Sequence, residues 1–298
     1  MAAEKSCRKW PPSYQLYGVG TLIALAVLVC HKAVGEIPRR APALLWGDLQ
    51  PGQYDVGFRV IYKHDRTRKW LPSKGHSNQA IPDKGRPIRI SVWYPAVRAN
   101  GTETMRYGDY FHYDSRSDFR EVYDGMEKYD RDATLADLNE VAPHGSDVFA
   151  KLCATPVAAV RNARPASGRF PVVLYAGGLG SRADANVELG EYLASHGYII
   201  ATVAQLGPSS EETSLETTAG EAGVHVGDLE FALRVLRDLP DVDVKHLAIA
   251  GHSAGGCCSY SIRDTQSGGK SNSGFGRVSA AQSRMGLPRR PTTKSASP

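Results

Sequence analysis

The chain has 298 residues, of which 42% are hydrophobic and 22% are charged, and this composition is that of an ordinary globular protein. The formal net charge is only +5, and Lys and Arg are scattered apart from a basic stretch near the C-terminus, which excludes a nucleic-acid-binding stripe. Five cysteines without metal-ligand spacing argue against a metal site or a disulfide framework.

The first 35 residues have the layout of a signal peptide. Basic residues precede the apolar run 16–30, and small residues allow cleavage after Gly35. The run is short for a membrane-spanning helix. We therefore expect export, to the periplasm or out of the cell. An uncleaved anchor, associating with the membrane through residues 16–30, is the alternative, whereas Val29 before Cys30 disfavours lipid attachment there.

Residues 36–53 contain three prolines, which exclude regular helix or interior strand and predict an extended linker. The folded domain is expected to begin at residue 54 and to run to residue 262. Apolar and polar side chains alternate at 56–62 and at 88–94, a pattern that predicts two half-buried antiparallel strands.

Residues 100–169 are polar and rich in tyrosine, and their pattern is weak. Two stretches, around 135–148 and 148–160, are modestly helical. We expect this region to form a cap or excursion from the main domain.

Three short apolar runs, at 171–176, 198–203 and 247–250, read as strands buried on both faces. A helix is expected after the first, stopped by Gly197 and presenting one face with Leu189, Tyr192, Leu193 and His196. A second helix is expected before the third, because apolar residues recur at steps of four and three: Ala222, Val226, Leu229, Leu233 and Leu236.

Alternating strands and helices predict an α/β fold with a doubly wound, mostly parallel sheet. Ligands bind such sheets at the carboxyl ends of the strands. Residues 263–298 are rich in Gly, Ser, Lys and Arg with few apolar side chains, so we expect a disordered C-terminal tail.

Gly251, His252, Ser253, Ala254 and Gly255 fit the pattern G-x-S-x-G directly after a buried strand. In a nucleophile elbow the glycines permit a tight strand-to-helix turn, and the serine hydroxyl projects above the sheet. A chance match is the alternative, but the strand before the motif argues against it.

An elbow serine acts on a carbonyl only if two N–H groups stabilise the oxyanion that forms. The fold takes them from the residue after the nucleophile and from the loop after an earlier strand. The candidates are Ala254 and Leu179, the latter within the glycine-rich residues 177–180. The alternative for that loop is a merely tight strand-to-helix turn.

The chain resembles bacterial esterases of the α/β-hydrolase superfamily related to platelet-activating factor acetylhydrolase and dienelactone hydrolase. The resemblance runs from residue 51 to about residue 260, and covers the first five of that fold's usual eight strands. The segments that carry it are 51–59 (PGQYDVGFR), 86–96 (RPIRISVWYPA), 170–180 (FPVVLYAGGLG), 193–198 (LASHGY) and 251–256 (GHSAGG).

The resemblance implies a Ser–His–Asp triad in the chain order serine, acid, histidine. All nine histidines precede Ser253, and Asp264 is the single carboxylate after it, too close to the elbow to serve as the triad acid. His252 and His225 are expected to be structural. We therefore expect a C-terminally truncated or frameshifted esterase, with the strand at 247–250 left as an exposed edge.

Three functions follow from these patterns. The first is a serine ester hydrolase for a small ester, such as a phospholipid acetyl ester or a lactone, which the resemblance implies without metal or organic cofactor. The second is a non-catalytic member that binds an ester-like ligand or a partner in the same cleft. The third is a defective product without a stable fold.

Overall fold

The computed structural model describes residues 44–70, 85–113, 120–178, 181–182, 185–207, 219–256 and 279–283. They belong to one compact unit, Pro42–Pro298. The expected export segment 1–35 lies outside the described residues. Within those residues, no helix has both the length and the apolar character needed to cross a bilayer.

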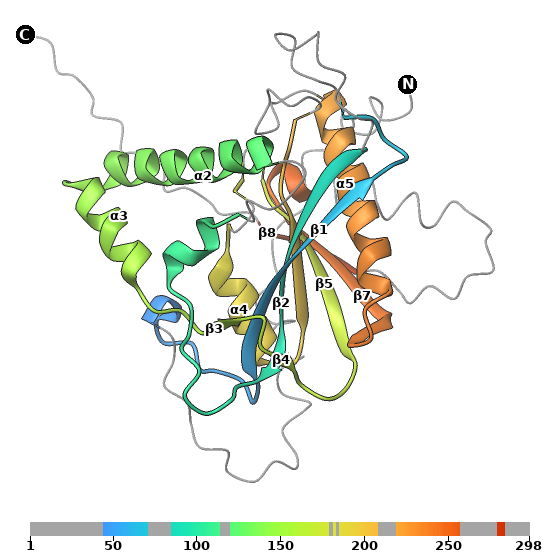
Figure 1. Cartoon of the computed structure of the whole chain (residues 1–298), viewed down its shortest axis with the longest axis horizontal. Coiled ribbons are helices and arrows are strands. Elements are labelled where there is room, and N and C mark those ends of the chain that lie inside the picture. The colour runs from blue at the N-terminus through green and yellow to red at the C-terminus, as the bar shows by residue number, and fades with distance from the viewer. Residues whose placement is uncertain are drawn as a thin grey trace, which may run out of the picture. The chain divides into compact units, whose positions relative to one another are not determined.

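The described strands form one mixed sheet in the order β3-β1-β2-β6-β5-β7-β8, with β4 paired to β2 (Figure 1). Their bounds are β1 Asp55–Asp65, β2 Arg86–Val97, β3 Ala159–Arg161, β4 Arg164–Pro165, β5 Phe170–Ala176, β6 Ile199–Val203, β7 Val242–His252 and β8 Ser279–Ser283.

Strands β1 and β2 pair antiparallel, as the sequence predicts. The expectation that both are half-buried is wrong for β2, which is buried on both faces along all but its last residue. The reason is its position: β2 lies between β1 and β6, and the sheet around it is covered on both sides. Strand β1, nearer the edge, keeps several half-exposed side chains.

The three strands predicted from apolar runs are confirmed as β5, β6 and β7, but only β6 is buried at every residue. The expectation of burial on both faces is wrong for β7, where buried and half-buried residues alternate from Leu247 to Ala250, and holds only in part for β5. Strands β6 and β7 lie on either side of β5 and both run parallel to it. Strand β2 is antiparallel to β6, and the parallel part of the sheet is formed by β6, β5, β7 and β8. The carboxyl ends of β5, β6 and β7 therefore meet at the same edge of the sheet.

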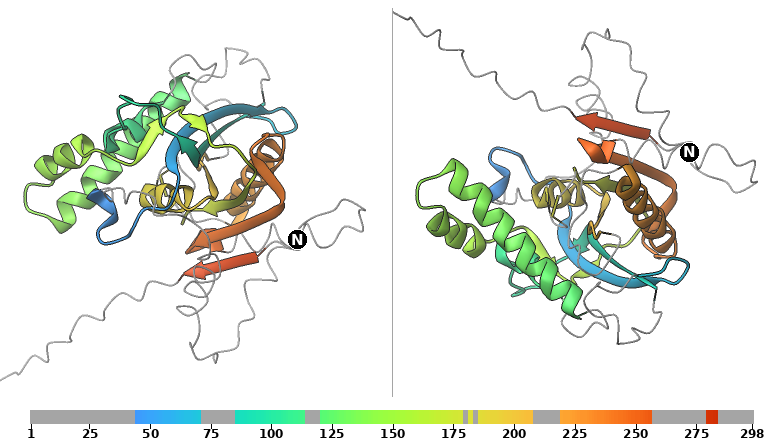
Figure 2. Two further views of the ribbon diagram at one scale, coloured as in Figure 1. Left: turned by 90° about the horizontal axis from the view of Figure 1, so that it is seen from below. Right: turned by 90° about the horizontal axis from the view of Figure 1, so that it is seen from above.

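Strand β8 lies in the region expected to be a disordered tail. It pairs parallel with β7 from Ser279 to Ser283, and Figure 2 shows the two side by side. The structure thus differs from the prediction at these five residues and at the expected open edge of β7. Without a neighbour on this side, β7 would present unpaired backbone N–H and C=O groups. The short segment Ser279–Ser283 pairs with them.

The described helices are α2 Arg120–Val141, α3 Gly145–Ala154, α4 Val187–Ser195 and α5 Ala219–Arg237, with 3₁₀ turns η2 Leu44–Trp46 and η3 Tyr107–Phe111. Successive residues of a strand point to opposite faces of the sheet, so the strands contribute side chains to a core on each face. On β2, Ile90 and Val92 face the core that α5 covers, whereas Trp93 faces the core that α4 covers.

The second predicted helix face is confirmed at Leu229, Leu233 and Leu236 of α5, which are buried, and Val226 is partly buried against the same core. The side chain of Ala222 is outside the described part of the chain. The prediction for α4 is wrong. Its buried positions include Val187, Gly190, Glu191 and Ala194, whereas Leu189 is 40% exposed. The turn at the end of α4 is as expected, since Gly197 has φ +92°.

Glu191 is buried in α4 because four donors surround its carboxylate. Trp46 Nε1 and Ala158 N bond to Oε2 at 3.1 Å, and Tyr110 OH and Ala159 N bond to Oε1 at 2.7 and 3.1 Å. Burial raises the pKa of this carboxyl, although all four hydrogen bonds act in the opposite sense. Trp46 lies within the predicted linker, so part of that segment belongs to the packed domain.

Helices α2 and α3 form the excursion expected between residues 100 and 169, but α2 begins fifteen residues before the stretch that looked helical. Its buried stripe is Tyr123, Met126, Asp130 and Thr134. Two of these residues are polar, and both are satisfied: Tyr113 OH donates to Asp130 Oδ2 at 2.6 Å and Thr134 Oγ1 donates to the Asp130 carbonyl at 2.7 Å.

Candidate active site

Ser253 occupies the turn between β7 and a helix that begins at Ala254. Its side chain is exposed, and its backbone is left-handed, with φ +53°. The other described non-glycine residues with positive φ are His144, Asn162 and Asn186. Asparagine and histidine tolerate this conformation better than serine does, so the strain at Ser253 marks an imposed geometry.

Two glycines allow the strand-to-helix turn to form against the end of β5. A Cβ built on Gly255 would lie 2.1 Å from the Ala176 carbonyl oxygen, so only glycine fits there. A Cβ on Gly178 would lie 3.4 Å from Ser253 Cβ and 3.3 Å from His252 Nδ1. The loop that follows β5 therefore lies against the elbow serine.

The same loop is held from its other side by β6. Gln205, two residues beyond the end of β6 and 5% exposed, donates from Nε2 to the carbonyl oxygens of Gly177 and Gly178 at 3.2 and 2.9 Å. Ser181 N also donates to the Gly178 carbonyl, at 2.9 Å. Sequence reasoning missed Gln205, although a polar residue at the carboxyl end of a buried strand was a usable signal.

A family model described as Chlorophyllase matches residues 139–271, which include β5, β6, β7 and the elbow. This model covers less than half of the chain, so the chain is similar to that family over these residues. No curated protein sequence matches the chain.

Solved structures with related folds include the ferulic acid esterase from Streptomyces cinnamoneus, with 21% identity and a TM-score of 0.49. That similarity covers 76% of this chain and 57% of the esterase. A hypothetical protein from Pseudomonas aeruginosa has 10% identity and a TM-score of 0.34, covering 76% of this chain and 44% of its own. This chain thus spans little more than half the length of the first and less than half of the second.

The other site residues predicted from the sequence lie around the turn at Ser253 or outside the described residues. Gly251 and His252 end β7, and Ala254 begins the helix after Ser253, with Gly256 N donating to the Ser253 carbonyl at 3.0 Å. Leu179 and Asp264 lie outside the described residues. Among the described residues, the Ser253 hydroxyl has no hydrogen-bond partner.

His225 lies on α5 beside the sheet, as predicted, and is 2% exposed. Neither ring nitrogen has a hydrogen-bond partner within the described part of the chain. Burial lowers the pKa of His225 to about 4, with Asp228 acting in the opposite sense and Arg86 reinforcing the shift. The imidazole is therefore neutral at physiological pH and packs as part of the core.

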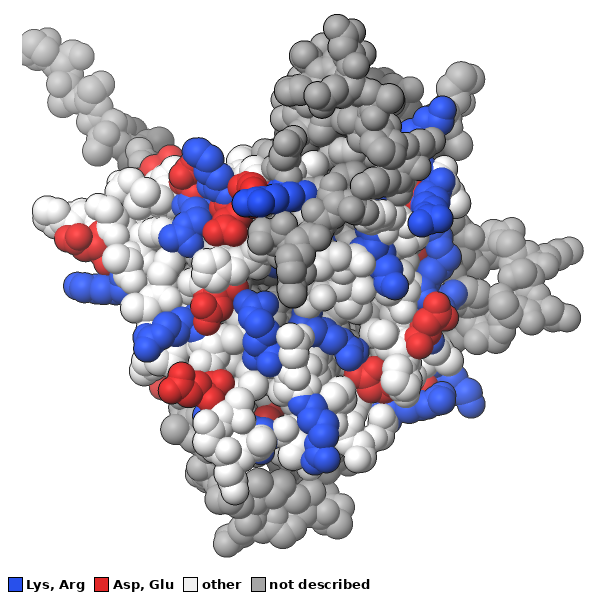
Figure 3. Space-filling view, in the orientation of Figure 1, with Lys and Arg blue, Asp and Glu red and all other residues white. Residues whose placement is uncertain are grey.

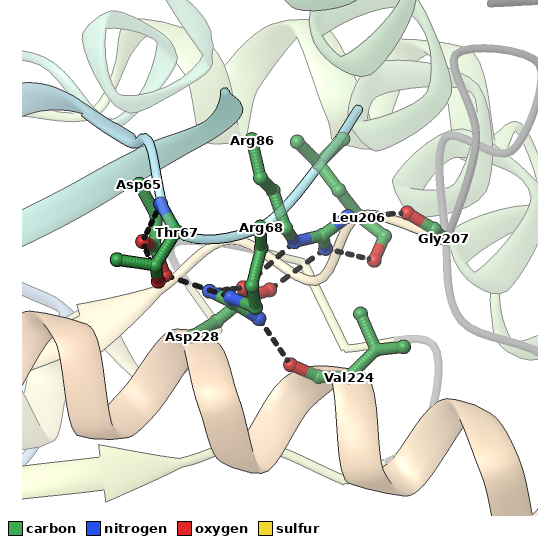
Figure 4. A network of polar contacts seen from close by, with 8 residues as sticks. All are labelled: Asp65, Thr67, Arg68, Arg86, Leu206, Gly207, Val224 and Asp228. Carbon is green, nitrogen blue, oxygen red and sulfur yellow. Dashed lines mark hydrogen bonds and ion pairs between the residues drawn. The ribbon is translucent and has the colours of Figure 1, made fainter. Parts of the chain in front are cut away.

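A polar network fixes the end of β6 to α5 (Figure 4). Arg86, itself buried, donates to both carboxylate oxygens of Asp228 at 2.7 and 2.8 Å. It also donates to the carbonyls of Leu206 and Gly207 at 2.6 and 2.7 Å. Arg68 adds a hydrogen bond to Asp228 at 2.6 Å. The network therefore holds the segment that directly follows Gln205.

Acidic and basic side chains are interspersed on the face of the molecule seen in Figure 3. Several of them form pairs on α2, including Lys128 with Asp132 and Arg120 with Asp124.

Proposed function

We propose that the chain is a serine hydrolase of carboxylic esters, with Ser253 as the nucleophile. The observation that carries this proposal is the left-handed, exposed serine between two glycines at the end of a parallel strand. A non-glycine residue in this conformation costs roughly 1–2 kcal/mol, which a purely structural turn would avoid by using glycine.

In the proposed reaction the Ser253 oxygen attacks the ester carbonyl, and its proton passes to a general base. The tetrahedral oxyanion is stabilised by the amide N–H groups of Ala254 and Leu179. Collapse releases the alcohol, which takes up a proton, and water then hydrolyses the acyl-enzyme by the same steps. The chemistry of these groups needs an ester carbonyl and no metal.

The substrate class follows from the family resemblance in the sequence. We propose a small carboxylic ester, as in the hydrolases related to platelet-activating factor acetylhydrolase and dienelactone hydrolase. The excursion built from α2 and α3 is the region where the acyl and alcohol groups of such substrates would be selected.

The second candidate function is ligand binding without turnover. It is favoured by the Ser253 hydroxyl, which no described side chain contacts by a hydrogen bond. In that case the cleft would hold an ester-like ligand and Ser253 would be idle.

Hydrolysis of p-nitrophenyl acetate by the full chain separates the two candidates. Turnover that disappears in Ser253→Ala supports the hydrolase. If the wild type and Ser253→Ala are equally inactive but bind a non-hydrolysable ester analogue with equal affinity, the binding function is correct instead. Turnover that appears only when imidazole is added would show a competent elbow that lacks its base.

A further inference from the structure

We propose that Gln205 is a positioning residue for the reaction at Ser253, because its buried amide sets the direction of the peptide bond after Gly178. This inference rests on the proposed hydrolase function and extends it to a residue on a different strand. Gln205 does not touch the reacting atoms; it acts through the loop that follows β5.

The first step of the argument is the orientation of the Gln205 amide. Two backbone carbonyl oxygens, of Gly177 and Gly178, lie 3.2 and 2.9 Å from it. Carbonyl oxygens accept hydrogen bonds and never donate them, so the facing atom must be Nε2. The side chain is 5% exposed, so water does not compete for this contact.

The second step is the geometry of the peptide bond. In a trans peptide the C=O and the following N–H point in opposite directions. The Gly178 carbonyl points toward the end of β6, where Gln205 holds it. Strand β5 lies between β6 and β7, so the opposite direction is toward β7 and Ser253.

The third step is proximity. Gly178 is close enough to the elbow that a Cβ on it would lie 3.4 Å from Ser253 Cβ. The proposed oxyanion donor, the N–H of Leu179, belongs to the same peptide bond as the Gly178 carbonyl, so a group that holds this carbonyl also orients the proposed donor. If the peptide flipped, its carbonyl oxygen would face the elbow instead, and a carbonyl repels an oxyanion.

The fourth step separates positioning from stability. Gln205 Oε1 is buried and has no hydrogen-bond partner among the described residues, so the amide is only half satisfied. Ser181 N also donates to the Gly178 carbonyl, but it comes from the same loop, so it keeps the turn folded without tying the peptide to the end of β6 when Gln205 is replaced. Loss of the amide is therefore expected to change the reaction rate far more than the melting temperature.

The test is the rate at which a fluorophosphonate probe labels Ser253 in the full chain. We expect Gln205→Met, of similar length but without donors, to lower the maximal labelling rate by at least about tenfold, and by no more than the factor of about 10²–10³ seen when an oxyanion donor itself is lost. The probe concentration at half-maximal rate should stay within about twofold. Thr134→Val, which also removes a buried bond to a backbone carbonyl, should leave both unchanged.

A second variant adds a pH dependence that a structural role would not produce. In Gln205→Glu an ionised carboxylate would face two carbonyl oxygens and turn the loop away, whereas the protonated carboxyl can donate one hydrogen bond. Its labelling rate relative to the wild type should recover on going from pH 8 to pH 5, while that of Gln205→Met should not.

Equal labelling of the wild type and Gln205→Met would overturn this inference alone. A wild type that is not labelled at Ser253 would overturn both the proposed function and the inference. If Gln205→Met does not fold, the Gln205→Glu variant decides: no recovery between pH 8 and pH 5 overturns the proposal.

Discussion

The backbone strain at Ser253 can be measured by replacing this residue. Its φ of +53° suits glycine, whereas alanine in the same place keeps a Cβ in the left-handed region. Both replacements remove the hydroxyl, so they differ only in backbone preference. We expect the free energy of unfolding of Ser253→Gly to exceed that of Ser253→Ala by ~1 kcal/mol in urea titrations.

A helix position gives the matched control for that comparison. Ala136 is exposed on α2, where glycine is less favourable than alanine by about 1 kcal/mol. Ala136→Gly should therefore lower stability, the reverse of the order at position 253. A Ser253→Ala variant more stable than Ser253→Gly would show that the turn is not strained.

His225 gives the second prediction at the scale of a residue. Burial lowers its pKa from 6.5 to about 4, so the unfolded chain binds a proton there before the folded chain does. The contribution of neutral His225 to the free energy of unfolding is fully present above pH 6.5. It is lost as the pH drops toward 4, by up to roughly 3 kcal/mol. His225→Leu should remove this part of the pH dependence, measured as the melting temperature at pH 7.5 and pH 5.

The leucine variant should also be no less stable than the wild type at pH 7.5, because it removes a buried polar ring whose nitrogens have no described partner. His112, whose side chain is 65% exposed, supplies the control. The melting temperature of His112→Gln should change between pH 7.5 and pH 5 as much as that of the wild type. If the melting temperature of His225→Leu changed between pH 7.5 and pH 5 as much as that of the wild type, His225 would not be buried as neutral imidazole.

At the scale of elements, the contact between β2 and α5 depends on one buried ion pair. Asp228 is 1% exposed in its side chain and Arg86 3%, and Arg68 joins them. Removing the charge of Asp228 leaves the buried guanidinium without its counter-charge. We expect Asp228→Asn to lower the free energy of unfolding by about 3–5 kcal/mol in guanidinium titrations.

Asp132 offers the same substitution in an exposed pair. It lies one turn from Lys128 on α2, and its side chain is 62% exposed. Asp132→Asn should change stability by less than about 0.5 kcal/mol. Similar losses for the two variants would contradict the view that burial makes the Arg86–Asp228 pair important.

The elements also show what sequence patterns could and could not predict. Strands β5, β6 and β7 were predictable because continuous β-branched runs have few other uses. The face of α4 was not, because its buried positions are Gly190, which packs on Trp93, and Glu191, which four donors satisfy. Helix α2 was obscured in the same way by Asp130 and Thr134. Buried polar groups that the fold satisfies by hydrogen bonds leave no apolar periodicity in the sequence.

On the scale of the whole molecule, the candidate site is a meeting of three strand ends. Strand β5 contributes the Gly177–Gly178 loop, β6 contributes Gln205 and β7 contributes Ser253. The serine and both glycines could be predicted from G-x-S-x-G and from the glycine-rich loop. The role of Gln205 could not, because only the strand order places β6 next to β5 and on the far side from β7.

The central claim is that Ser253 is a working nucleophile, and active-site labelling tests it most directly. The full chain and its Ser253→Ala variant are incubated with a fluorophosphonate probe, and the adduct is located by peptide mass spectrometry. We expect one probe per chain, on Ser253, and no adduct on the variant. A wild-type chain labelled no more than the variant would contradict the claim.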